Sequence, residues 1–239
     1  MNSSGLSLNR STFEHRKKNL DYIRALYLLF ALELVIALIW SSFCLGFWDK
    51  LGSGVVRWWE FGLTAGIICA ILVLATLFVS AVKKFPVNWA VYSIFTLCFA
   101  HLCAFLSCWD ESRLFYYALW IMTVIAIALA IYAFCSNYYM ENITTLLIVI
   151  GAGSLVLVSF IVFSEISVFK LILVFVPVMI FGVYLAYDLR TSVRNSLFDH
   201  DDEDPVSGAV RIWIETVLVF CRFGELTGKM FHKSSEVRK

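Results

Sequence analysis

The residues of this sequence that are best suited to chemistry are ionisable side chains set within or beside long apolar runs. A charged group inside a lipid bilayer costs about 2.5 to 3.5 kcal/mol on insertion scales, so each such residue is a candidate functional group. The candidates are Arg24, Glu33, His101, Asp188, Arg211, Glu215 and Arg222.

Asp188 and Glu215 form the most informative pair. They stand on consecutive predicted helices joined by a polar loop, which can bring the two carboxyl groups together near one membrane face. Two carboxylates at close range share one proton and titrate as a unit, and a calcium ion competes with that proton. The pair is therefore predicted to be a pH-sensitive gate or a calcium site.

A purely structural role for both carboxylates is the alternative. Arg211 stands four residues before Glu215 on the same predicted helix face, so the two side chains can neutralise each other. Arg190 or Arg194 can do the same for Asp188. The sequence leaves both interpretations open.

The remaining candidates are predicted to support the gate or the packing. Glu33 is nine residues from Arg24, so we expect its partner to be a basic group on another helix. His101 stands alone on an apolar helix and is predicted to be a hydrogen-bonded packing residue. An intramembrane zinc enzyme needs about three ligands, and His101 is the only histidine within a span, so we expect no enzyme and no cofactor besides calcium.

The composition shows which elements must position these residues. Hydrophobic residues make up 61% of the 239 residues and charged residues 15%, whereas a soluble domain carries about 25% charged residues. The net charge of +1 does not favour a nucleic-acid partner. The chain is predicted to be an all-α integral membrane protein that crosses the lipid bilayer about seven times.

Six apolar runs and one interrupted run account for these crossings. The last run contains Arg211, Glu215 and Arg222, so it is too polar to face lipid and should lie at the centre of the bundle. Pro177 is expected to kink the sixth run. The predicted spans cover residues 24–47, 61–82, 85–109, 114–134, 143–163, 168–187 and 205–223.

These spans form one membrane domain over residues 22–224, between a basic N-terminal tail (1–21) and a basic C-terminal tail (225–239). Basic residues before the first span and at Lys83 and Lys84 lie on one side of the membrane, which predicts a cytosolic N-terminus. The side of the C-terminus stays open. The seven cysteines stand within apolar runs or at their ends and are predicted to be buried thiols.

Three stretches of the sequence resemble the transmembrane Bax inhibitor motif family, the Bax-inhibitor and lifeguard-like proteins. The resemblance covers most of the chain from about residue 22, and the family usually has glutamine at the position of Glu33. The three stretches are Ile23-Arg24-Ala25-Leu26-Tyr27 with Glu33-Leu34, Lys84-Phe85-Pro86-Val87-Asn88 with Phe95-Thr96-Leu97, and Tyr187-Asp188 with Ile212-Trp213-Ile214-Glu215.

This resemblance implies six helices around a central seventh helix, and a pH-sensing calcium-leak gate of two aspartates that map onto Asp188 and Glu215. The aspartate-to-glutamate change at Glu215 and the short tails look like those of a viral member, such as the cytomegalovirus seven-span proteins. The implied function is a calcium-permeable leak channel of the endoplasmic reticulum or Golgi that lowers stored calcium and inhibits apoptosis. The alternative is a non-conducting scaffold that binds host membrane proteins and redirects them in immune evasion.

The predicted orientation can be tested with an epitope tag at the N-terminus. An antibody should reach this tag after selective permeabilisation of the plasma membrane, because the basic residues hold the N-terminus on the cytosolic side. Detection only after the internal membranes have also been opened would contradict the assigned orientation.

Overall fold

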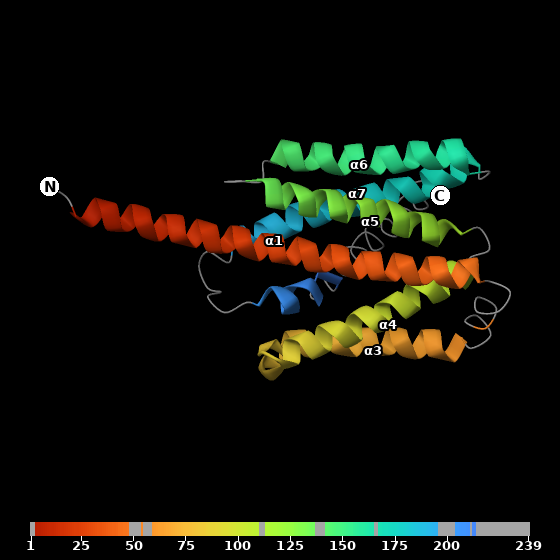
Figure 1. Ribbon diagram of the computed structural model, residues 1–239, viewed down its shortest axis with the longest axis horizontal. Helices are drawn as coiled ribbons and strands as arrows, with labels where there is room; N and C mark the ends of the chain where they lie inside the picture. Colours follow the sequence, from red (N-terminus) through yellow and green to blue (C-terminus); the bar gives the residue numbers. More distant parts are fainter. Residues whose placement is uncertain are drawn as a thin grey trace, which may run out of the picture.

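The structure is a computed structural model that describes residues 3–47, 54, 59–109, 113–136, 142–164, 167–195, 204–210 and 212–213. Its main elements are α-helices that run roughly side by side (Figure 1). In chain order they are α1 (Ser3–Gly46), α3 (Trp59–Phe78), the short 3₁₀ helix η2 (Ser80–Lys83), α4 (Val87–Trp109), α5 (Leu114–Cys135), α6 (Asn142–Phe163) and α7 (Val168–Asn195).

Within these described residues, six helices are long and apolar enough to cross a membrane. This confirms the predicted class and the first six predicted spans. The candidate spans are Leu20–Gly46, Trp59–Thr76, Val87–Trp109, Leu114–Cys135, Ile143–Phe163 and Val168–Tyr187.

The helix boundaries differ from the expected ones at two places. Helix α1 begins at Ser3, so the basic region before the first span continues the same helix. Helix α7 continues through Pro177 to Asn195, which places Asp188 inside the helix and not at its end. Helical hydrogen bonding does not require apolar side chains, so both helices extend beyond the apolar part of their sequence.

The start of the seventh predicted span is also helical. Residues 204–210 and 212–213, called the inner segment below, lie between α1 and α4 in Figure 1. Val206, Ala209, Val210 and Ile212 are all buried there. The described part of this span is thus an interior element, as its interrupted apolar pattern predicts.

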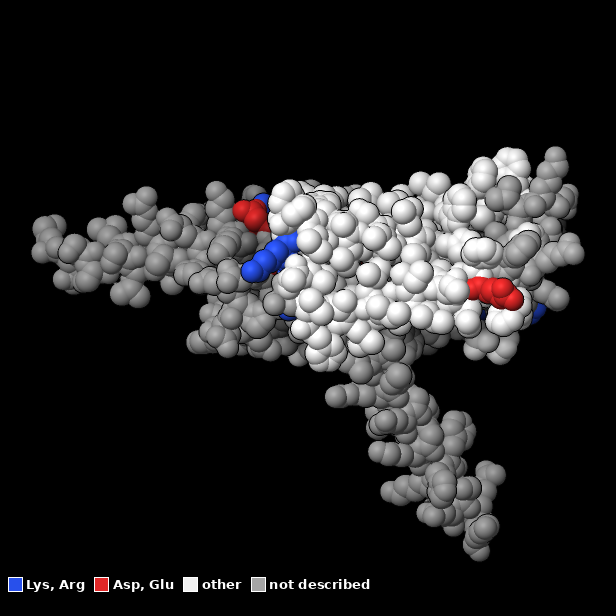
Figure 2. Space-filling view, turned by 90° about the horizontal axis from the view of Figure 1, so that it is seen from below, with Lys and Arg blue, Asp and Glu red and all other residues white. Residues whose placement is uncertain are grey.

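Helix α1 connects the two sides of the bundle. It packs against α4 on one side and against α5 on the other. Helix α4 in turn packs against α3, and α5 packs against α6 and α7. Phe30, Leu34 and Ala37 of α1 are at most 1% exposed and belong to the main hydrophobic core. On the face shown in Figure 2, the acidic and basic residues of the described part gather near the two ends, which leaves an uncharged band for lipid contact.

The contact between α3 and α4 depends on two small residues one turn apart. A Cβ atom on Gly62 would lie 2.6 Å from Cγ of the Phe105 ring, and one on Gly66 would lie 3.6 Å from a methyl group of Leu102. Small residues at this spacing allow membrane helices to approach closely. Gly62 therefore sets the separation of α3 and α4.

The six cysteines in the described part are free thiols. Cys44, Cys69, Cys103 and Cys108 are buried, as predicted. The prediction is wrong for Cys135, which is exposed, and for Cys98, which is only partly buried. Cys135 stands at the end of α5, where a thiol can lie against lipid as readily as an alkyl group, whereas Cys98 packs against the main hydrophobic core with part of its side chain exposed. Cys221 lies outside the described residues.

Replacing Gly62 by alanine should destabilise the bundle, because the new methyl group must displace the Phe105 ring. Overpacking of this kind costs about 1 to 3 kcal/mol. We expect a lower midpoint of thermal unfolding for purified Gly62→Ala, measured by fluorescence-detected size-exclusion chromatography after heating.

The matched control is Gly151→Ala on α6, where an added Cβ atom has no neighbour within 4 Å. This variant should unfold at or slightly above the parent temperature, because alanine favours the helix. Equal midpoints for the two variants would contradict the close approach of α3 and α4.

Candidate functional site at the junction of α1, α4 and the inner segment

Glu33 is the acidic side chain around which the candidate site is built. It lies midway along the apolar span of α1 and is 0% exposed. Its Oε2 accepts a hydrogen bond of 2.9 Å from the indole Nε1 of Trp213 in the inner segment. Its Oε1 is buried and has no hydrogen-bond partner in the part of the chain that the structure describes.

Arg211 lies outside the described residues, so the pairing of Glu33 with a basic group on another helix stays a prediction. Among the described residues, the partner of Glu33 is a neutral N–H donor. The physical reason is that burying an ion pair removes two charges from water, whereas an indole N–H brings a donor without a second charge.

The ring of Trp213 lies between aromatic rings of two helices. Its centroid is 5.4 Å from that of Phe30 on α1 and 4.2 Å from that of Phe99 on α4. Close by, the Tyr92 hydroxyl on α4 donates a 2.9 Å hydrogen bond to the backbone carbonyl of Leu29 on α1. Trp213 thus joins the inner segment to both helices in a junction built mostly of rings.

The beginning of the inner segment is also held in place. Asn88 at the start of α4 donates from Nδ2 to Oδ2 of Asp204 over 2.5 Å, and its own Oδ1 accepts from the backbone N–H of Trp89. The backbone carbonyl of Asp204 accepts from the N–H of Gly208. Side-chain bonds at a helix start satisfy groups that the helix leaves unpaired.

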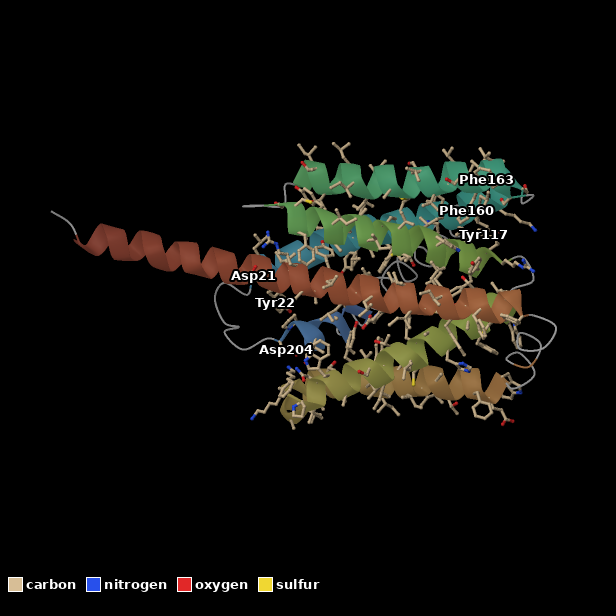
Figure 3. The ribbon with its side chains drawn as sticks, viewed as in Figure 1. Asp21, Tyr22, Tyr117, Phe160, Phe163 and Asp204 are labelled. Atoms are coloured by element: carbon tan, nitrogen blue, oxygen red, sulfur yellow. The ribbon has the colours of Figure 1, made fainter. Side chains whose placement is uncertain are left out.

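Gly208 marks the closest approach of the inner segment to α1. A Cβ atom there would lie 2.6 Å from the Tyr22 hydroxyl and 3.0 Å from a methyl group of Leu26. Figure 3 shows Asp21, Tyr22 and Asp204 at one end of the bundle and Tyr117, Phe160 and Phe163 at the other. The inner segment therefore begins at the end where the apolar span of α1 starts.

Arg24 holds α1 to the end of α5. Its Nε donates to the carbonyl of Ala133 at 2.9 Å, and its Nη2 donates to the carbonyl of Ser136 at 2.8 Å. Its Nη1 lies 3.3 Å from the carboxylate of Asp21. A cation at a helix C-terminus satisfies unpaired carbonyls and favours the helix dipole. These contacts make Arg24 a helix cap.

The other predicted site residues are placed only in part. Asp188 lies in α7, and His101 is partly buried on α4 with no hydrogen bond to another described residue. In the described part of the chain, no three potential metal ligands lie together. Arg211, Glu215 and Arg222 lie outside the described residues, so the pairing of Asp188 with Glu215 stays a prediction.

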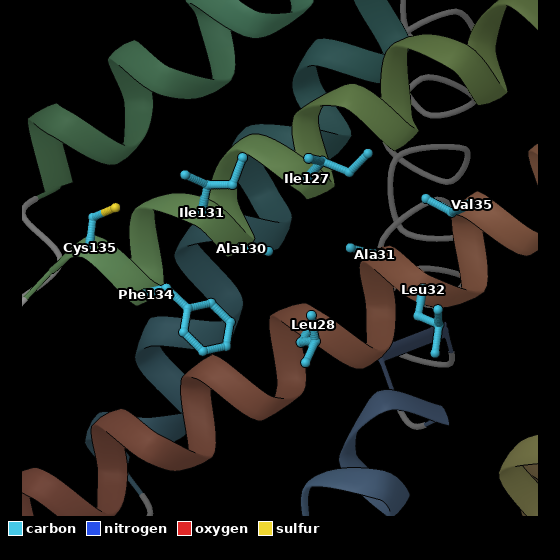
Figure 4. Close-up of a pocket in the computed structure, with 9 residues that line it drawn as sticks. All are labelled: Leu28, Ala31, Leu32, Val35, Ile127, Ala130, Ile131, Phe134 and Cys135. Atoms are coloured by element: carbon cyan, nitrogen blue, oxygen red, sulfur yellow. The ribbon is translucent and has the colours of Figure 1, made fainter.

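An apolar groove between α1 and α5 has a volume of about 370 Å³ (Figure 4). Ala31 and Ala130 are the buried members of its lining. No charged or amide side chain lines the groove, so it offers a cation no ligand but suits an acyl chain. The lining residues are Leu28, Ala31, Leu32, Val35, Ile127, Ala130, Ile131, Phe134 and Cys135.

Reasoning from the sequence missed Trp213, Asn88 and Asp204 as parts of this site. One signal was available for Trp213, because a tryptophan in an interior segment needs an acceptor for its N–H. A buried acid such as Glu33 needs a donor. Nothing in the sequence indicated that these two residues meet.

Comparison with known proteins gives the family of the chain. The family described as "Inhibitor of apoptosis-promoting Bax1" matches residues 20–231, which is most of the sequence. Protein lifeguard 3 of Mus musculus is 27% identical over 152 residues, which cover 61% of this chain and 48% of the relative. The chain thus spans about half the length of that relative, and no solved structure matches. The matched region contains every described transmembrane helix and the inner segment, so the chain belongs to the Bax inhibitor family.

Proposed function

We propose that this chain is a calcium-permeable leak channel of intracellular membranes, with a pH-sensitive gate formed by Asp188 and Glu215. By lowering the calcium stored in the endoplasmic reticulum or Golgi, it makes cells less prone to apoptosis. The permeant ion is the only cofactor in this proposal, and the bilayer is the only obligatory partner.

Family membership supports the link to apoptosis. The family is described by its inhibition of an apoptosis-promoting protein, and the match extends over residues 20–231. A membrane-embedded inhibitor can act on ion content without a soluble catalytic domain. The six apolar helices agree with such a mode of action.

The observation that carries the proposal is the burial of the inner segment. Val206, Ala209, Val210 and Ile212 are at most 4% exposed, so the segment that leads to Glu215 enters the bundle interior. Glu215 follows Trp213 by two residues in the sequence and lies outside the described residues. Asp188 is carried by α7, which ends on the side of the bundle where the inner segment begins (Figure 1).

Shared protonation gives this pair its proposed gating chemistry. Two carboxyl groups in contact hold one proton between them, which links the chains of α7 and the last span by a hydrogen bond. Loss of this proton leaves two negative charges that repel each other and attract calcium. Rising pH then opens the path, and falling pH closes it.

The conducting function is tested with purified protein in liposomes that contain a calcium-sensitive dye. Calcium entry should exceed that of protein-free liposomes and should change with pH. A protein that only binds and redirects other membrane proteins needs no cation path, so the absence of flux would favour the scaffold function.

The gate is tested by removing each carboxylate in turn. Asp188→Asn and Glu215→Gln should each abolish the pH dependence of calcium flux, because the proton belongs to the pair. The double variant should add little to either single one, as expected for groups that act as a unit.

Asp21→Asn is the matched control, since it removes a carboxylate that is 57% exposed at the same end of the bundle. It should retain the pH response of the parent. If Arg211 neutralises Glu215 instead, Glu215→Gln should mainly lower the protein yield, and Asp188→Asn should keep its pH dependence. Unchanged pH responses in both variants at normal expression would refute the gate.

A further inference from the structure

Glu33 is a buried acid that the proposed gate does not use. It is 0% exposed in the middle of the α1 span, with one carboxyl oxygen bonded to Trp213 and the other without a partner among the described residues. A carboxylate accepts about four hydrogen bonds and is very costly to bury when it receives only one. The geometry around Glu33 therefore does not suit a negative charge.

Among the described residues, the helices around Glu33 bring no cation toward it; Arg211 lies outside these residues. Tyr92 on α4 and Cys69 on α3 are its titratable neighbours, and both are neutral acids. Helix α5 has no charged residue, and the only charged residue of α3 is Glu60 at its start. His101 on α4 is two residues beyond Phe99, so it points away from the Trp213 ring.

The remaining charged groups of these elements lie farther along the chain. On α1 itself, Arg24 is more than two turns away and donates to the carbonyls of α5. In the described inner segment, Asp204 is bonded to Asn88 at the end of the bundle. Helix α7 touches α1 and carries Lys170 near its start and Asp188, Arg190 and Arg194 in its C-terminal third.

We propose that Glu33 is a proton-binding site: it carries a proton at neutral pH, and this neutral acid fastens the inner segment to α1 through Trp213. The carbonyl oxygen accepts from the indole, and the hydroxyl group occupies the position without an acceptor. A buried hydroxyl without a partner costs about 1 to 3 kcal/mol, far less than an unpaired buried charge.

Loss of this proton loosens the junction. An ionised Glu33 needs water or a cation at its second oxygen, which is buried and has no partner among the described residues while Trp213 is packed between Phe30 and Phe99. The folded bundle then binds more protons than the unfolded chain, so its stability falls as the pH rises. This inference does not rest on calcium conduction, because its test measures a protonation state.

Infrared spectroscopy of the full chain in lipid nanodiscs measures this state directly. The parent protein at neutral pH should show the C=O stretching band of a neutral carboxylic acid, and Glu33→Gln should lose that band. Asp21→Asn is the matched control and should keep it, since this variant removes a 57% exposed carboxylate and leaves Glu33 in place. A neutral-acid band that is the same in the parent and in Glu33→Gln would overturn the proposal.

A second variant keeps the test decisive if Glu33→Gln fails to fold. Trp213→Phe removes the donor but leaves the acid, so the neutral-acid band should remain and move to higher frequency as its carbonyl loses the hydrogen bond. An unmoved band, or no neutral-acid band, would contradict the proposed bond.

Thermal unfolding gives an independent test. The parent should lose stability between neutral and alkaline pH, and Glu33→Gln should lose clearly less. Equal losses of stability in the two proteins would also overturn the proposal.

Discussion

A membrane bundle has no water in its interior, so each polar group that it buries must find its partner within the protein or remain neutral. In this chain that constraint acts most strongly at Glu33, which is fully buried at the middle of α1. Its contact with Trp213 links α1 to the inner segment, and the rings of Phe30 and Phe99 hold the indole in place. The position of the inner segment against α1 follows from this contact.

The rest of the architecture follows from the position of α1 between two groups of helices. On one side, α4 approaches through Tyr92 and carries α3, whose glycines permit close packing. On the other side, Arg24 fixes the end of α5, against which α6 and α7 pack. Because α1 contacts both groups of helices, a shift of α1 relative to the inner segment would change the packing of α4 and of α5.

The proposed gate and the Glu33 junction are physically distinct. The gate that we propose concerns Asp188 of α7 and Glu215, which lies outside the described residues. The junction concerns one acid at mid-membrane, where no described group is a cation. Protons can act on both, but a pair of close carboxylates responds to mutual repulsion, whereas Glu33 responds to the lack of solvation. The apolar groove between α1 and α5 takes part in neither, since its lining offers no polar ligand.

The sequence alone determined the membrane class, the first six spans and the interior position of the start of the last one, because these depend on local composition and on the cost of charge in lipid. It also singled out Glu33, but it did not indicate that Glu33 accepts a hydrogen bond from Trp213. Only the tertiary structure brought Glu33 to Trp213, which is 180 residues away, and Arg24 to the carbonyl of Ala133, which is 109 residues away. Contacts of this kind depend on how the helices pack around α1, and no local pattern of residues predicts that packing.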